Sequence, residues 1–117
     1  MMARILVIDD DQTVRGVLRK ALAGAGHEVV EAPGGQAGIE LYRQAPADLV
    51  ITDLFMPETD GLTVIEEVRK LNPETRIVSI TAGEGDDCAL ARELGAERTF
   101  VKPFSIPDIL RTVEELL

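Results

Sequence analysis

Five short apolar runs, each separated from the next by a helical pattern, constrain the fold of this chain more than any other feature. The runs are ILVI (5–8), EVV (28–30), DLVI (48–51), IVSI (77–80) and TFV (99–101). ILVI is apolar at consecutive rather than alternate positions, which is typical of a strand buried on both faces. Strands that alternate with helices form parallel sheets covered on both sides. The sequence therefore predicts an α/β fold with a doubly wound, five-stranded parallel sheet.

Apolar residues at steps of three and four predict the helices between these strands. We expect them over residues 14–22, 37–42, 64–71, 86–94 and 107–117. Glycine or proline follows the first four of these segments, as GAG (24–26), Pro46, Pro73 and Gly95. Both residue types end helices, so each helix is predicted to return the chain to the sheet.

The length of 117 residues fits one domain spanning residues 1–117, and a content of 45% hydrophobic residues is that of a folded protein. A net charge of −9 argues against direct nucleic-acid binding, which depends on clustered Lys and Arg. No apolar run approaches the length of about 18 residues that indicates a membrane helix, and the N-terminal run is too short for a signal peptide. We expect a cytoplasmic protein.

The chain has one cysteine, Cys88, and one histidine, His27. A single cysteine cannot form an internal disulfide, and the two residues are too few for a zinc site of the usual sulfur and nitrogen type. Any metal site in this chain must therefore use oxygen ligands. We predict that Cys88 is a small apolar residue of a helix and that His27 is a loop residue.

Polar side chains follow four of the five predicted strands. They are Asp9, Asp10 and Asp11 after the first strand, Asp53 after the third, Thr81 after the fourth and Lys102 after the fifth. Each one alone would pass as a turn residue, because turns favour such side chains. In an open parallel sheet, however, ligands bind beyond the carboxyl ends of the strands. The four groups together predict one site at that edge.

The residue types at this edge are suited to phosphoryl transfer. Neighbouring carboxylates must either take up protons or bind a cation, and Mg²⁺ prefers oxygen ligands. An aspartate can attack phosphorus as a nucleophile, while a hydroxyl and an ammonium group stabilise charge on the phosphoryl oxygens. Thr81 and Lys102 would supply the hydroxyl and the ammonium.

The same residues carry a resemblance to a known family. ILVIDDD (5–11), ITDLFMPETDG (51–61), IVSITA (77–82) and GAERTFVKPF (95–104) have the order and spacing seen in bacterial response-regulator receiver domains. The chain resembles the chemotaxis-regulator type, the phosphoacceptor half of a two-component system, over essentially its whole length. The resemblance implies a flavodoxin-like (βα)₅ fold with strand order 2-1-3-4-5.

The resemblance also implies a role for each site residue. Asp53 would be the phosphorylated aspartate. Asp9 and Asp10 would hold Mg²⁺, Asp10 most directly, together with Asp53 and the backbone carbonyl of Phe55. Thr81 would bind the phosphoryl group, Lys102 would be the family's ammonium group, Phe100 would be its aromatic switch, and the Lys102–Pro103 bond would be cis. Asp11 is left to cap the following helix.

A receiver takes its phosphoryl group from a phosphohistidine, so the partner would be a sensor histidine kinase or a phosphotransfer protein. The receiver would catalyse its own phosphorylation and dephosphorylation and would not be a turnover enzyme. Its output would pass through the face formed by the fourth helix, fifth strand and fifth helix, to a downstream protein or a missing C-terminal output domain. A phosphorylation-dependent dimer, and the choice between a stand-alone regulator and a piece of a longer protein, stay open.

Two positions beside the site bear on the lifetime of the phosphoryl group. The resemblance implies that the residues at Phe55 and Gly83, each two positions after a site residue, tune dephosphorylation. Neither offers a polar group to position an attacking water. We therefore expect a phosphorylated state that does not decay unusually fast.

Two alternatives remain at this stage. Asp9, Asp11 and Thr13 form the DxDxT motif of haloacid-dehalogenase-like phosphatases, in which Asp9 would be the nucleophile and Asp11 the general acid. Against this stand the short chain, the position of GDD (85–87) before Lys102, and the lack of a task for Asp53. The second alternative is a degenerate receiver that acts only as a binding module, although such domains usually lack one of the residues that this chain retains.

Overall fold

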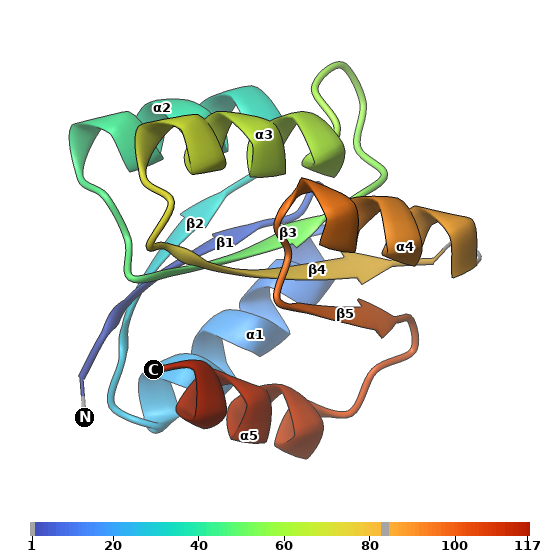
Figure 1. Cartoon of the computed structure of the whole chain (residues 1–117). Coiled ribbons are helices and arrows are strands. Elements are labelled where there is room, and N and C mark those ends of the chain that lie inside the picture. Colours follow the sequence, from blue (N-terminus) through green and yellow to red (C-terminus); the bar gives the residue numbers. More distant parts are fainter. Residues whose placement is uncertain (1, 83–84) are drawn as a thin grey trace.

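A computed structural model of the chain describes residues 2–82 and 85–117. Within this part of the chain, one parallel sheet has the strand order β2-β1-β3-β4-β5, as the resemblance implied (Figure 1). The strands are β1 (Arg4–Ile8), β2 (Glu28–Ala32), β3 (Leu49–Asp53), β4 (Arg76–Thr81) and β5 (Arg98–Val101). The helices are α1 (Gln12–Gly24), α2 (Gly35–Gln44), α3 (Gly61–Leu71), α4 (Gly85–Leu94) and α5 (Ile106–Leu116). The α/β prediction is confirmed.

Helices cover both faces of the sheet, with α1 and α5 on one side and α2, α3 and α4 on the other (Figure 1). The buried side chains accordingly form two core clusters. The first core cluster, on the α2 and α3 side, contains Leu6 and Ile8, and the second, on the α1 and α5 side, contains Ile5 and Val7. Successive residues of β1 thus enter opposite cores, which explains why ILVI is apolar at every position.

Side-chain caps fix where three of the helices begin. The Asp11 carboxylate accepts hydrogen bonds from the backbone N–H groups of Thr13 and Val14, at 2.9 and 3.3 Å. Asp60 caps α3 and Ser105 caps α5 in the same manner. These contacts satisfy backbone donors that have no partner inside the helix. The prediction that Asp11 is a helix cap is confirmed.

A polar network ties the elements together at the amino ends of the strands. Arg69 of α3 donates hydrogen bonds to the carbonyl oxygens of Thr75 and Gly95 and to the carboxylate of Glu97, at 2.6, 2.7 and 2.7 Å. Glu97 also accepts a bond of 2.6 Å from the backbone N–H of Ile77, the second residue of β4. One guanidinium therefore joins α3 to the entrances of β4 and β5. No helix in the described ranges is both long and apolar enough to cross a membrane.

The loop between β3 and α3 folds back so tightly that its last residue must be glycine. A Cβ atom on Gly61 would lie 2.1 Å from the carbonyl oxygen of Asp53 and 2.7 Å from the Cα of Leu54. The Gly61 N–H donates to the Leu54 carbonyl at 3.0 Å. Because the obstructing atoms are backbone atoms, a side chain here must displace the end of β3.

We predict that Gly61→Ala lowers the free energy of unfolding by about 2 kcal/mol, because the added methyl group has no space. Gly16→Ala is the matched control, since a Cβ at this α1 position would meet nothing within 4 Å. It should raise the stability by about 0.5 to 1 kcal/mol through helix propensity. Urea unfolding measures both changes, and equal effects of the two substitutions would contradict the prediction.

Candidate functional site

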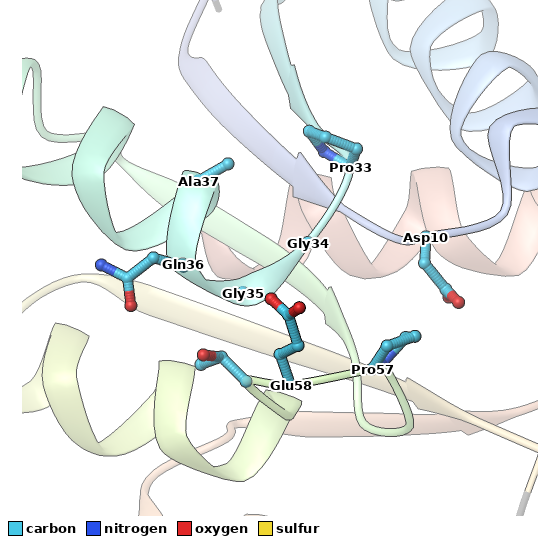
Figure 2. Close-up of a pocket in the computed structure, with 9 residues that line it drawn as sticks. Asp10, Pro33, Gly34, Gly35, Gln36, Ala37, Pro57 and Glu58 are labelled. Carbon is cyan, nitrogen blue, oxygen red and sulfur yellow. The ribbon is translucent and has the colours of Figure 1, made fainter.

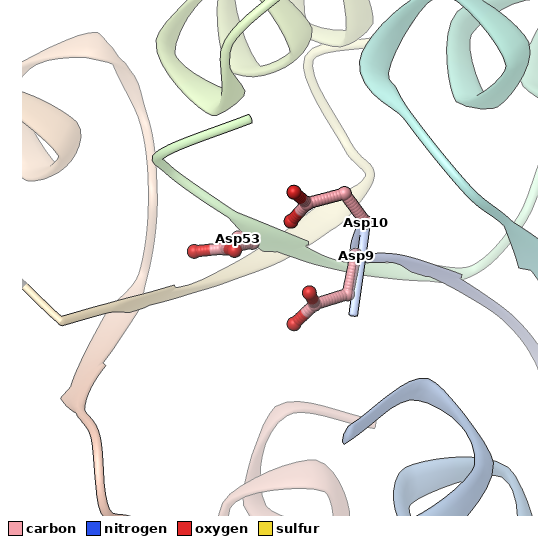
Figure 3. Close-up of side chains that lie close together, drawn as sticks. All are labelled: Asp9, Asp10 and Asp53. Atoms are coloured by element: carbon pink, nitrogen blue, oxygen red, sulfur yellow. The ribbon is translucent and has the colours of Figure 1, made fainter. Parts of the chain in front are cut away.

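Three aspartates converge where β1 and β3 end (Figure 3). Asp9 and Asp10 follow β1, and Asp53 is the last residue of the neighbouring strand β3. One carboxylate oxygen from each lies within 4.8 Å of the other two. The adjacency of β1 and β3 in the sheet, with Ile8 opposite Thr52, creates this cluster from residues more than 40 positions apart.

The three carboxylates differ in burial and in hydrogen bonding. Asp9 is 1% exposed and Asp53 is 4% exposed, whereas Asp10 lies at the surface. Asp9 Oδ1 accepts a hydrogen bond of 2.9 Å from the Asp11 N–H, but its buried Oδ2 has no hydrogen-bond partner within the described chain. Burying a carboxylate oxygen without such a partner is costly. An oxygen-lined cluster with an unsatisfied buried acceptor fits Mg²⁺.

The electrostatics of Asp9 point the same way. Burial raises the pKa of Asp9 to about 6; the Asp11 N–H opposes this rise, Asp53 adds to it and Lys102 again opposes it. The charged form of Asp9 still predominates at pH 7, but it is less stable than that of an exposed aspartate, and a further positive charge would stabilise it. A divalent cation would supply that charge.

Lys102 faces the two buried carboxylates from the end of β5. Its Nζ lies 3.4 Å from Asp53 Oδ2 and 3.5 Å from Asp9 Oδ2. Burial lowers the pKa of Lys102, but Asp9 and Asp53 together outweigh this and leave it above its usual value, so the ammonium group stays charged at neutral pH. The Lys102 N–H donates to the Thr81 carbonyl at 2.7 Å, and the Lys102–Pro103 bond is cis, as the resemblance implied.

Thr81 and Phe55 complete the rim around Asp53. Thr81 is fully buried at the end of β4, one residue beyond Ile80, which pairs with Asp53. Phe55 is 53% exposed, and its N–H lies 3.4 Å from Asp53 Oδ1. The structure thus brings Asp9, Asp10, Asp53, Phe55, Thr81 and Lys102 to one edge of the sheet. Gly83 lies outside the described residues.

Phe100 does not join this site. It pairs with Ile80 in the β4–β5 ladder and packs against the second core cluster, which also contains Ile80. Successive side chains of a strand point to opposite faces, so Thr81 lies on the other face of the sheet. Thr99 and Val101, on either side of Phe100, share the face of Thr81, and Val101 pairs with Thr81. Phe100 thus lies on the opposite face from Thr81 in this structure, and its role as an aromatic switch stays a prediction.

A cavity of ≈ 430 Å³ opens beside Asp10 (Figure 2). Its walls are Asp10, residues 33–37 at the start of α2, and loop residues 57–59, including the carboxylate of Glu58. Mg²⁺ usually keeps several water ligands when a protein binds it. Of the three clustered aspartates, Asp10 lines this cavity, so the cavity leaves room for waters beside Asp10.

His27 and Arg15 lie outside the cluster of site residues and make hydrogen bonds to the backbone. His27 Nδ1 accepts a hydrogen bond of 3.2 Å from the Ala3 N–H, which is a structural role before β2. Arg15, which the sequence did not single out, donates a bond of 2.8 Å to the carbonyl oxygen of Asp9. A bond from a side chain to a backbone carbonyl leaves no residue-type signal at the acceptor, so only the structure reveals it.

Comparison with known proteins agrees with this edge geometry. The family model for the response regulator receiver domain matches residues 5–114. The chain belongs to this receiver family. Membership overturns the phosphatase alternative, and Asp11, its general acid, is occupied as the α1 cap. Receivers of this family act in two-component signalling.

Named relatives show how this receiver compares in length. It is 34% identical to the chemotaxis protein CheY of Bacillus subtilis, with 100% of this chain and 99% of CheY covered. It is 37% identical to the transcriptional regulator NtrC of Azospirillum brasilense, with 98% of this chain but 24% of NtrC covered. The crystal structure of CheY4 from Vibrio cholerae matches it with a TM-score of 0.93 at 28% identity over 100% of both chains.

We predict that Asp9→Asn stabilises the metal-free receiver at neutral pH by roughly 1 to 3 kcal/mol, because the neutral amide removes a buried charge. A carboxyl group whose pKa rises on folding binds its proton more tightly in the folded state, so its ionisation destabilises the fold. The gain from Asn should therefore shrink as the pH falls through about 6, where Asp9 itself becomes protonated.

Denaturant unfolding in the presence of a chelator, at several pH values, measures this effect. Asp10→Asn is the control, because it removes a charge from the same cluster at an exposed position. Its gain should be smaller. A loss of stability for Asp9→Asn at neutral pH would contradict the electrostatic account of the site.

Proposed function

We propose that this receiver accepts a phosphoryl group from a phosphohistidine onto Asp53 in a Mg²⁺-dependent reaction, in the cytoplasm and as a single domain over residues 1–117. The partner would be a sensor histidine kinase or a phosphotransfer protein. The observation that carries the proposal is the surroundings of Asp53. Its carboxylate lies within reach of the charged Lys102 and of the acidic pair Asp9 and Asp10.

The residues that would hold Mg²⁺ are Asp9, Asp10, Asp53 and the backbone carbonyl of Phe55. Asp9 Oδ2 supports this set, because it is buried without a hydrogen bond in the described chain and its ion pair with Lys102 is 3.5 Å long; the cavity beside Asp10 also supports it. When bound, the cation supplies positive charge that neutralises the carboxylates and the incoming phosphoryl oxygens.

The transfer itself is a displacement at phosphorus. A carboxylate oxygen of Asp53 forms a bond to phosphorus as the bond from phosphorus to the imidazole nitrogen breaks, and the imidazole leaves with that electron pair. The Lys102 ammonium and the Thr81 hydroxyl stabilise the negative charge on the phosphoryl oxygens. The 3.4 Å contact between Lys102 Nζ and Asp53 Oδ2 supports this role.

The signal would be a shift in population toward a state that the phosphoryl group favours. Rearrangement of Thr81 would change the face formed by α4, β5 and α5. A downstream protein or an output domain would bind this face. Phe100 would be the aromatic switch of this coupling, and it would have to leave its present packing on the opposite face from Thr81. The net charge of −9 supports a protein target and not direct nucleic-acid binding.

We predict that acetyl phosphate and Mg²⁺ add one phosphoryl group to the receiver, and that Asp53→Asn abolishes the addition. Intact-mass measurement detects the product. Asp11→Ala is the control: it removes the α1 cap but leaves the site, so labelling should persist. Labelling of Asp53→Asn would contradict the proposal, and an unlabelled wild-type receiver would favour the degenerate binding module.

We predict that the phosphoryl group outlasts a timescale of seconds after the donor is removed, because the exposed Phe55 cannot position an attacking water. Phe55→Asn should shorten the lifetime several-fold by adding a polar group at this place. Leu71→Asn, at an equally exposed apolar position at the far end of α3, should leave the lifetime unchanged. Loss of the label within seconds from the wild-type receiver would contradict this prediction.

A further inference from the structure

Arg15 holds the peptide group that links the two residues of the acidic pair. Its Nη1 donates a 2.8 Å hydrogen bond to the carbonyl oxygen of Asp9, and that carbonyl carbon is bonded to the nitrogen of Asp10. A peptide unit is planar, so the direction of the Asp9 carbonyl also fixes the plane that contains the nitrogen and Cα of Asp10. The Arg15 side chain is only 15% exposed, so this contact is shielded from competing water.

A second contact fixes the guanidinium itself. Arg15 Nε lies 3.2 Å from Oε1 of Glu31 on β2, while Oε2 of the same carboxylate lies 3.0 Å from Nε of Arg19. The Asp9 N–H donates to the Ala32 carbonyl of β2 at 3.2 Å. Both polar backbone groups of Asp9 are therefore anchored to β2, one directly and the other through Arg15.

This arrangement requires the shape of arginine. The planar guanidinium donates from Nη1 to the Asp9 carbonyl and from Nε to Glu31 at the same time. A lysine ammonium at position 15 would keep the positive charge but would lose this fixed fork. Arg15→Lys therefore separates the effect of the geometry from the effect of the charge.

We propose that Arg15 is a positioning residue that orients the Asp9–Asp10 peptide group so that both carboxylates can bind one divalent cation. The inference rests on the proposed function, since it concerns the same Mg²⁺ site. Outer groups that orient metal ligands typically change metal affinity by about 10- to 100-fold when they are removed.

Charge and positioning predict opposite effects of removing this side chain. If Arg15 acted only through its charge, then replacing it by a neutral residue would strengthen Mg²⁺ binding, because a cation near three carboxylates repels a second cation. If Arg15 positions the peptide group, the same replacement weakens binding. The direction of the change in Mg²⁺ affinity decides between them.

The experiment is a calorimetric titration with Mg²⁺ of the wild-type receiver and of Arg15→Met, Arg15→Lys and Arg19→Met. We expect about tenfold weaker binding for Arg15→Met. Arg15→Lys, with its charge intact, should also bind more weakly than the wild type. Arg19→Met is the matched control, because it removes a charge from the same helix and a contact to Glu31, while the Asp9 carbonyl keeps its hydrogen bond from Arg15. It should bind Mg²⁺ as tightly as the wild type or more tightly.

Amide resonances of the metal-free proteins give a readout that does not depend on activity. The Asp10 and Asp11 amides should shift in both Arg15 variants and stay in place in Arg19→Met, because Arg15 donates to the Asp9 carbonyl whereas Arg19 contacts Glu31. Unfolding by denaturant establishes that each variant is folded. If Arg15→Met does not fold, Arg15→Lys carries the test.

The outcomes separate this inference from the proposed function. Folded Arg15 variants that bind Mg²⁺ like the wild type, or more tightly, would overturn the positioning role alone. Mg²⁺ binding without labelling of Asp53 in the wild type would overturn the phosphoacceptor role and leave the positioning role to be decided by the affinities. A wild-type receiver that neither binds Mg²⁺ nor takes a phosphoryl group would overturn both.

Discussion

Mutual repulsion of carboxylates at the ends of β1 and β3 is the constraint on which the rest of the structure depends. Asp9 and Asp53 are buried beside one another, and neither could be held there in an isolated peptide. The ladder between β1 and β3 fixes their separation, and the two apolar cores beneath supply the stability that opposes the repulsion. The positive charge of Lys102 offsets part of the repulsion between the carboxylates. The negative charge that is left favours binding of a divalent cation.

The strands could be predicted from the sequence because short, mostly apolar runs alternate with helical patterns. ILVI is apolar at every position and each of the other runs contains one polar residue; each run lies in an observed strand apart from Asp48, the first residue of DLVI. The edge cluster was also predictable, because parallel strands place their carboxyl ends together. The cap at Asp11 followed from its position just before a helical pattern.

Other features depend on information that the sequence does not display. The face occupied by Phe100 depends on the register of β5, a strand of four residues whose pattern does not show which side chains enter the core. The contrast between buried Asp9 and exposed Asp10 arises because the chain turns away from the sheet between them. Arg15 was missed because its partner is a carbonyl oxygen, which every residue has.

The Arg69 network lies at the other end of the same strands, away from the acidic cluster. It joins α3 to the entrances of β4 and β5 through carbonyl oxygens and one carboxylate, with no residue of the phosphoryl site among its partners. The side chains of this network are thus different from those of the phosphoryl site. A substitution in the loops at the reactive end can therefore alter the chemistry of the site and leave the hydrogen bonds of Arg69 in place.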